Sequence, residues 1–341
     1  MFEMFHDPSV PFAERRIIDM KNTFFYTSTS ADLPYKAIFD YDLYNTLKGG
    51  KIIPVHLQLS VTNKCNLNCD FCSFRGRDKH LSLDIDTLKD IVKKFINLGT
   101  KAITITGGGE PLCYENINKF LIFCTTMDIK VGLVTNGLLL SNLSPEASKA
   151  ITWCRISLAD SRSDDELKIL ESILPTVVSN NKHIFWSFSY VVLEKQNHKL
   201  QLRAINLAKS LKFGNIRFVR DQENQDTIDL QETKLYIQEK SVLDLCVFDS
   251  KDYVGHIGAC RVYLLRPFVA ADGYIYPCCT LQYNVEGSDF TDDQKICYYA
   301  EFNEFIESQK SYKASCQKCF SNHYNNYLEV ALNPILFKEW V

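Results

Sequence analysis

The residues of this sequence that could do chemistry are its cysteines, and three of them stand within the stretch CNLNCDFC (65–72). Cys65, Cys69 and Cys72 follow a run typical of a buried strand, so the three thiols are expected on one loop. Such a loop can be a disulfide fragment, half of a zinc site, or the ligand set of an iron–sulfur cluster with one coordination position open. For zinc, His80 is the nearest candidate for a further ligand.

The cysteine count favours metal or redox chemistry. The chain has 341 residues and 13 cysteines, an odd number. Glu3, Asp7 and Pro8 interrupt the apolar residues at its start, which argues against a signal peptide. No stretch approaches the ~18 uncharged apolar residues of a membrane span. We therefore expect a cytoplasmic protein without a disulfide framework, and the net charge of -3 argues against non-specific polyanion binding.

The other cysteines are either scattered singly or gathered late in the chain. The single ones are expected to be small buried hydrophobes: Cys113, Cys124, Cys154 and Cys246. The late group contains Cys260, Cys278, Cys279, Cys297, Cys316 and Cys319.

Short apolar runs alternate with helical patterns from about residue 55 to 220. Strands are expected over 55–61, 102–106, 130–135, 154–158, 184–192 and 216–219. Helices are expected over 84–99, 115–127, from 144, 164–179 and 198–212. This alternation predicts an α/β fold with a parallel sheet and right-handed crossovers. Six units suit a partial (β/α)6 TIM-like barrel, and an open doubly wound sheet is the alternative.

The unusual residues follow the strands of this expected sheet. The three cysteines follow the first strand, GGGEP (107–111) the second and TNG (135–137) the third, while Ser157 ends the fourth. Ligand sites of parallel α/β sheets lie at the carboxyl ends of the strands. We therefore expect these segments to form one site.

Four regions are expected along the chain. Residues 1–50 form an N-terminal extension packed on the barrel, 51–220 the barrel, 221–255 a connector, and 256–341 a small α+β domain. In this last region Asp272-Gly273 predicts the turn of a β-hairpin.

The stretch CNLNCDFC resembles the CxxxCxΦC signature of the radical S-adenosylmethionine (SAM) enzymes, with Phe71 as the aromatic residue Φ. GGGEP, TNG and RISLAD are similar to later motifs of this family, in the family's order, and the resemblance covers about residues 52–220. It implies a [4Fe–4S] cluster held by three cysteines, with the amine and carboxylate of SAM on the open iron. It also implies an enzyme that cleaves SAM to a 5′-deoxyadenosyl radical.

The resemblance implies roles for further residues. Gly107, Gly108 and Gly109 would let the backbone approach the methionyl group, and Glu110 would accept from its ammonium. Thr135 and Asn136 would reach the ribose hydroxyls, Arg155 or Ser157 the carboxylate, and Phe71 the adenine. Tyr190, at a later strand end, is a further cofactor candidate, and Arg217 and Arg220 are substrate candidates. Each has a plain structural alternative as turn, cap, core or surface residue.

The late cysteines resemble the auxiliary-cluster domain called SPASM, in its shortened twitch form. Cys260-x12-Gly273-x4-Cys278 matches one half, and Cys316-x2-Cys319, expected on a turn, supplies the other. The resemblance implies a second [4Fe–4S] cluster held by these four cysteines, with Cys279 and Cys297 as spare thiols. A structural zinc site on the same four residues is the alternative.

These features together predict a radical SAM oxidoreductase or maturase that removes a hydrogen atom from an unactivated C–H of a small molecule or peptide. The resemblance implies an electron donor such as flavodoxin or ferredoxin as partner. Two alternatives remain open: a radical SAM enzyme that modifies a nucleotide or nucleic acid, and a non-catalytic iron–sulfur or zinc scaffold.

Overall fold

The computed structural model describes residues 53–221, 224, 226–240, 243–248, 254–279, 294–308, 312–319 and 321–332. The chain divides into two compact units, one of residues 52–325 and one that joins 1–51 to 326–341. The extension expected over residues 1–50 lies outside the described residues. The fold given below is that of the larger unit. Among the described helices, none has both the length and the apolarity needed to cross a membrane.

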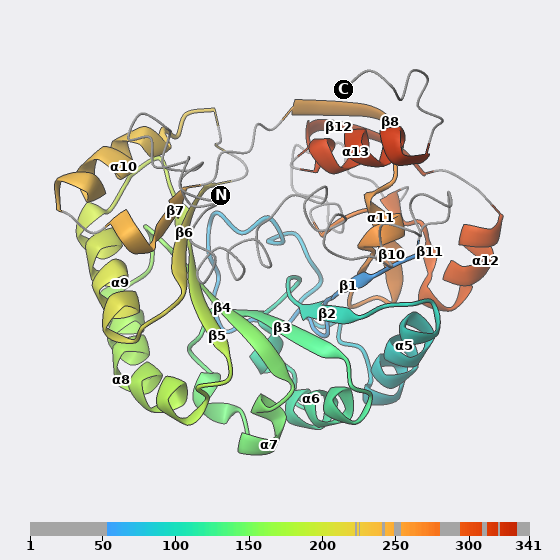
Figure 1. The fold of residues 1–341 in the computed structure, drawn as a ribbon, viewed down its shortest axis with the longest axis horizontal. Helices are drawn as coiled ribbons and strands as arrows, with labels where there is room; N and C mark the ends of the chain where they lie inside the picture. The colour runs from blue at the N-terminus through green and yellow to red at the C-terminus, as the bar shows by residue number, and fades with distance from the viewer. Residues whose placement is uncertain are drawn as a thin grey trace, which may run out of the picture. The chain divides into compact units, whose positions relative to one another are not determined.

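Six parallel strands alternate with helices in the first part of this unit (Figure 1). The strands are β1 (His56–Leu59), β2 (Ala102–Ile105), β3 (Lys130–Thr135), β4 (Ile151–Ala159), β5 (Phe185–Val192) and β6 (Asn215–Arg220). The helices are α5 (Ile85–Asn97), α6 (Ile117–Thr126), α7 (Pro145–Ser148), α8 (Asp164–Asn180), α9 (His198–Ser210) and α10 (Leu230–Glu239). The predicted partial (β/α)6 barrel is confirmed.

Apolar and polar side chains alternate along the strands, so the two faces of the sheet differ in polarity. Leu57 and Leu59 of β1 and Ile103 and Ile105 of β2 are buried against the helices, which lie along the outer side of the curved sheet in Figure 1. Residues between them, such as Gln58, point to the inner side because successive side chains alternate. The outer face is therefore the apolar core, and the inner face carries the polar side chains.

The helices begin where the sequence supplies caps. Asp84 accepts hydrogen bonds from the backbone N–H groups of Asp86 and Thr87 and starts α5. Ser163 and Glu166 form a capping box at the start of α8.

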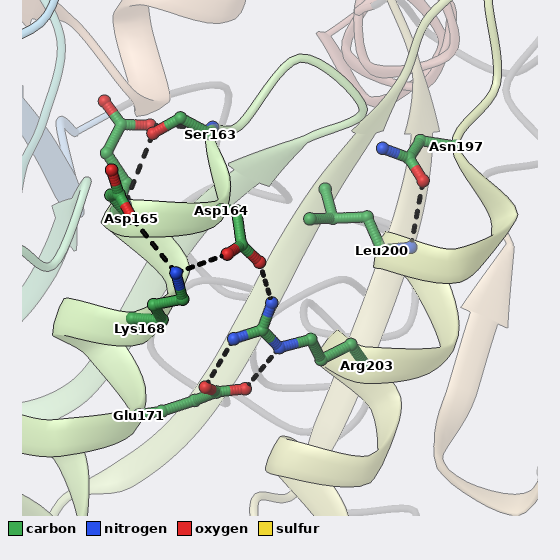
Figure 2. A network of polar contacts seen from close by, with 9 residues as sticks. Ser163, Asp164, Asp165, Lys168, Glu171, Asn197, Leu200 and Arg203 are labelled. Atoms are coloured by element: carbon green, nitrogen blue, oxygen red, sulfur yellow. Dashed lines mark hydrogen bonds and ion pairs between the residues drawn. The ribbon is translucent and has the colours of Figure 1, made fainter.

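Between α8 and α9, Arg203 makes a bidentate ion pair with Glu171 at 2.6 Å and also contacts Asp164 (Figure 2).

The sheet extends beyond the six expected strands at both edges. Its order is β11-β10-β9-β1-β2-β3-β4-β5-β6-β7, with β7 (Cys246–Phe248) parallel to β6. At the other edge β9 (Phe268–Val269) is parallel to β1, and β10 (Tyr274–Tyr276) and β11 (Cys297–Tyr298) follow antiparallel. The predicted hairpin is thus β9–β10, and Gly273 takes a φ of 79° in its turn.

The late cysteines come from this added part and from a two-stranded sheet of β8 (Val254–Cys260) and β12 (Tyr312–Cys319). The short helices α11 (Val262–Leu265) and α12 (Phe302–Glu307) complete this region, and α13 (Asn322–Leu332) follows β12. The prediction that Cys316 and Cys319 lie on a turn is wrong. Both lie in β12, where the pairing register with β8 shifts between them, so the irregular strand supplies the bend.

Candidate functional site

The three early cysteines lie together on the loop that follows β1. Cys72 N–H donates to the Cys69 carbonyl at 3.1 Å, and the Leu67 N–H donates to the Cys65 sulfur at 3.4 Å, so the loop turns back on itself. The thiols are partly buried. Burial raises the pKa of Cys65 and Cys69, and the neighbouring charge of Cys72 raises both further. The thiols therefore act on one another electrostatically.

A buried arginine fixes this loop, and sequence reasoning missed it. Arg77, 7% exposed, donates from Nε to the Asn63 carbonyl at 2.9 Å and from Nη1 to the Phe74 carbonyl at 2.7 Å. The same Nη1 lies 3.7 Å from the Cys72 sulfur, a hydrogen bond to the thiol. Arg77 thus ties the entry and exit of the loop together and places a positive charge beside one thiol.

The glycines after β2 pack against the entry to this loop. A Cβ on Gly109 would lie 2.0 Å from the Lys64 carbonyl oxygen, and one on Gly108 would lie 2.3 Å from Ser60 Oγ. Gly108 also takes a φ of 92°. A Cβ on Gly107 would meet the Phe74 ring at 2.8 Å. The close approach that these glycines permit is therefore to the chain's own backbone and side chains, and their approach to SAM stays a prediction.

Glu110 joins the loops after β2 and β3. Its carboxylate, in a residue 3% exposed, accepts hydrogen bonds from Leu112 N–H at 3.0 Å, Thr135 Oγ1 at 2.6 Å and Asn136 N–H at 2.6 Å. Burial raises the pKa of this carboxyl group, although the three hydrogen bonds oppose the rise. Glu110 and Thr135 thus form an internal bridge, and their contact with SAM is not tested by this geometry.

Asn136 and a second buried arginine connect further strand ends to the cysteine loop. Asn136 Nδ2 donates to Asn66 Oδ1 at 2.7 Å, within the loop. Arg162, 9% exposed, donates to the carbonyls of Asn136 and Ser157, the latter at 3.1 Å. Burial lowers its pKa, while the negative charges of Glu166 and Cys69 raise it. Arg162 follows Ser157 by five residues, and no motif spacing in the sequence identified it as a site residue.

The remaining predicted cofactor residues are placed differently. Arg155 and Ser157 alternate with the buried Cys154, Ile156 and Leu158, so they face the inner side of the sheet. Tyr190 lies on the opposite, helix-facing side of β5, is fully buried, and donates to Asp160 Oδ1 at 2.9 Å.

The structure therefore does not bring Tyr190 to the cysteine loop, because side chains alternate along β5 and that of Tyr190 points to the apolar core. Phe71 is partly buried on the cysteine loop itself, and its contact with adenine stays a prediction.

The four late cysteines of the SPASM-like pattern also lie together. Burial and, to a smaller extent, the charges of Cys278 and Cys319 raise the pKa of Cys260 to about 12. Cys316 is affected in the same way, with Cys278, Cys319 and Cys260 as its charged neighbours. The buried Asn325 donates from Nδ2 to the Cys260 sulfur at 3.8 Å and accepts from Arg261 N–H at 2.7 Å. Sequence reasoning missed this side chain.

The single cysteines behave as predicted with one exception. Cys124, Cys154 and Cys246 are buried in the core. Cys113 is only partly buried, and its sulfur lies 3.8 Å from Asn66 Oδ1 on the cysteine loop. Burial raises its pKa, and the charges of Glu110 and Cys65 add to the rise. The prediction of a buried hydrophobe is wrong for Cys113, because the short helix Pro111–Cys113 delivers it to the loop.

The two cysteine groups supply thiol donors, which both zinc and iron–sulfur clusters accept. Ligands of one tetrahedral zinc converge, with sulfurs about 3.8 Å apart at a Zn–S distance of ~2.3 Å. Within the described ranges, no group of three or more His, Cys, Asp or Glu side chains is arranged to hold one metal ion. His80 is exposed. Three cysteines on one loop are a donor set that a [4Fe–4S] cluster with one open coordination position could use.

Known proteins resemble this chain in sequence and in fold. The family model of the Radical SAM superfamily matches residues 59–158. A GTP 3',8-cyclase of Helicobacter pylori is 27% identical over 203 residues, which cover 56% of this chain and 62% of that enzyme. The chain thus matches less than two thirds of the length of this relative.

Two solved structures share the fold over most of this chain. Streptococcus suis SuiB bound to the precursor peptide SuiA has a TM-score of 0.54 at 16% identity, covering 90% of this chain and 72% of that one. Native anSMEcpe with bound AdoMet and Kp18Cys peptide has a TM-score of 0.52 at 13% identity, covering 82% of this chain and 84% of that one.

Proposed function

We propose that the chain is a radical SAM enzyme, supported by the match of the Radical SAM superfamily model to residues 59–158. The protein reductively cleaves SAM and removes a hydrogen atom from an unactivated C–H of a small-molecule or peptide substrate. The net reaction is an oxidation or maturation assisted by a second cluster. The observation that carries the proposal is the gathering of Cys65, Cys69 and Cys72 on one loop that contacts the segments after β2 and β3.

The three cysteines of the loop and the two buried arginines beside it have different roles in this proposal. Cys65, Cys69 and Cys72 would hold a [4Fe–4S] cluster, which would supply the electron for the reductive cleavage of SAM. Arg77 and Arg162 keep the loop and the strand ends in place and add positive charge to a site that binds a carboxylate.

The second cysteine group holds an auxiliary [4Fe–4S] cluster in this proposal. Four thiolates, from Cys260, Cys278, Cys316 and Cys319, saturate it, so it exchanges an electron instead of binding substrate. Structural zinc on the same residues is the alternative. The protein works in the cytoplasm, and a flavodoxin or ferredoxin is the electron donor.

A nucleotide substrate is the second candidate. It is favoured by the relative from Helicobacter pylori, whose name describes a reaction on GTP. Incubating the reduced protein with SAM and GTP separates the two candidates, because only the nucleotide function consumes GTP together with SAM.

The test of the main proposal is SAM cleavage. Anaerobically reconstituted, dithionite-reduced protein should convert SAM to 5′-deoxyadenosine and methionine, measured by liquid chromatography and mass spectrometry. The matched control is Cys69→Ala, which should lose the product. A protein that holds its iron and forms no 5′-deoxyadenosine is a scaffold, and the proposal is then wrong. Iron analysis belongs to the same experiment, with about eight irons per chain expected for two clusters and about four for one.

A further inference from the structure

The inner face of the sheet carries a row of polar side chains across β4, β5 and β6. The register places Ser157 beside Ser189 and Ser189 beside Arg217. Their strand neighbours Ile156, Phe188 and Phe218 are fully buried on the helix side, so this row points to the inner side. The strands that carry it are adjacent in Figure 1. Arg217 is the cation of this row.

Arg217 carries its charge next to another arginine. Arg155 lies on the same inner face of β4, two residues before Ser157. Burial and, to a smaller extent, the positive charge of Arg217 lower the pKa of Arg155 to about 9. Arg155 therefore remains protonated at neutral pH, and two guanidinium groups repel each other across the inner face.

The guanidinium group of Arg217 lacks an anionic partner among the described residues. Throughout the part of the chain that the structure describes, no carboxylate forms an ion pair with Arg217, and its Nε is buried without a hydrogen-bond acceptor. A buried donor without a partner is unfavourable, and more so when it is charged. A guanidinium group offers two parallel N–H donors that match a carboxylate or a phosphate. The unsatisfied donors and the repulsion both favour an anion here.

We propose that Arg217, together with the Ser189 hydroxyl, binds an oxyanion of the substrate, either a carboxylate or a phosphate. This inference rests on the proposed function, for which it specifies the substrate as an anion. The inference gives the substrate anion a binding site different from that of the SAM carboxylate, which is expected at Arg155 or Ser157 on β4.

The position of Arg217 suits a substrate. It is two strands away from Ser157, which corresponds to about 10 Å at ~4.8 Å per strand. The Ser157 carbonyl is held by Arg162, whose charge acts on Cys69 in the cysteine loop. A substrate anchored at Arg217 by its anionic end can thus extend toward the cysteine loop without competing for the residues expected to hold SAM.

The test is anion binding by the cluster-loaded protein with saturating SAM, measured by isothermal titration calorimetry. Pyrophosphate and glutarate are the two probes, because one presents phosphates and the other carboxylates. We expect wild-type protein to bind at least one of them. Arg217→Gln should weaken this binding by about 10- to 100-fold, the loss of a charge-assisted pair. Preference for pyrophosphate indicates a phosphorylated substrate, and preference for glutarate a carboxylate-bearing one.

Two further variants control the experiment. Arg217→Lys keeps the charge and loses the planar pair of donors, so it should bind with intermediate affinity. Lys209→Gln removes a positive charge from the exposed end of α9 and should leave anion binding unchanged. Thermal unfolding of each variant shows whether Arg217→Gln still folds. If it does not, the anion affinity of Arg217→Lys is compared with that of wild type instead.

The outcomes separate the inference from the proposed function. Binding that Arg217→Gln and Arg217→Lys leave unaltered overturns the inference, as does a wild-type protein that cleaves SAM and binds neither probe. A wild-type preparation that forms no 5′-deoxyadenosine overturns the proposed function, whatever its anion affinity.

Discussion

At the scale of single residues, the contact between Arg77 and Cys72 has the most direct link to electron transfer. The guanidinium is buried and donates to the sulfur at 3.7 Å. Hydrogen bonds and positive charge near thiolate ligands stabilise the reduced, more negative form of a cluster and so raise its reduction potential. Arg77 is thus expected to make the early cluster easier to reduce.

Arg77→Met should therefore lower the reduction potential of the early cluster. We expect at least a tenfold smaller ratio of reduced to oxidised cluster at a fixed potential, which is about 59 mV for one electron. A redox titration monitored by electron paramagnetic resonance measures it. Arg75→Met is the matched control, because Arg75 is exposed and its Nη1 donates to the Asp70 carbonyl at 2.8 Å. Equal potentials in all three proteins would contradict the role given to Arg77.

Cys113 provides a second test at this scale, because it is a fourth thiol near the cysteine loop. If three cysteines hold the early cluster, Cys113→Ala should retain all its iron and still change its resonance spectrum when SAM is added. Cys72→Ala is the comparison and should lose about four irons. Loss of iron in Cys113→Ala would make Cys113 a ligand and leave no open coordination position for SAM.

At the scale of elements, α8 and α9 are joined by the ion pairs of Arg203 with Glu171 and Asp164 (Figure 2). Arg203 lowers the pKa of Glu171 through its hydrogen bonds. A carboxyl group with a lowered pKa contributes stability above its unfolded pKa and loses that contribution as the pH falls through its folded pKa. The pairs are partly exposed, so their contribution is small.

Arg203→Gln should accordingly lower the melting temperature at pH 7 by about 1–3 °C, measured by circular dichroism. The difference from wild type should shrink as the pH falls through the lowered pKa of Glu171, below which this carboxyl group is protonated in both proteins. It should also shrink in 1 M salt, where the Debye length is about 3 Å. A difference that persists at low pH and high salt would show that Arg203 acts through packing instead.

The strands and helices of the barrel were predicted from the sequence because each has its own pattern of apolar residues. The strand expected over 130–135 is β3 itself, and helices α8 and α9 lie within one or two residues of their expected ranges. Strand β7 was not predicted, because three residues are too short for an alternation pattern, and the parallel pairing of β9 with β1 was not predicted either. Their place in the sheet depends on contacts with strands far away in the sequence.

The candidate site was predictable to a smaller extent. Motif spacing identified the cysteines, Glu110 and Asn136, which the structure places at adjoining loops. Arg77, Arg162 and Asn325 were missed, since their contacts arise only where separate loops meet. Tyr190 was misplaced because a strand position alone does not say which face its side chain takes.

At the scale of the larger unit, one sheet runs from β11 to β7 and links the region of the late cysteines to the barrel. Cys316→Ala tests whether the late group holds iron. The expected result is a fall from about eight to about four irons per chain, measured by metal analysis after anaerobic purification. Cys279→Ala, next to Cys278, is the matched control and should keep all its iron. Loss of zinc with unchanged iron would establish the structural zinc alternative.

The pairing of β1 with β9 has a consequence for the order of events during synthesis. It joins Gln58 to Phe268 and Leu59 to Val269, so the edge of β1 stays open on the ribosome until those late residues emerge. Closing so long a segment is entropically costly, which makes the docking of β9 a late step. Cys65, Cys69 and Cys72 are made long before that closure, so their loop is accessible to iron and sulfide delivery while the chain is still growing.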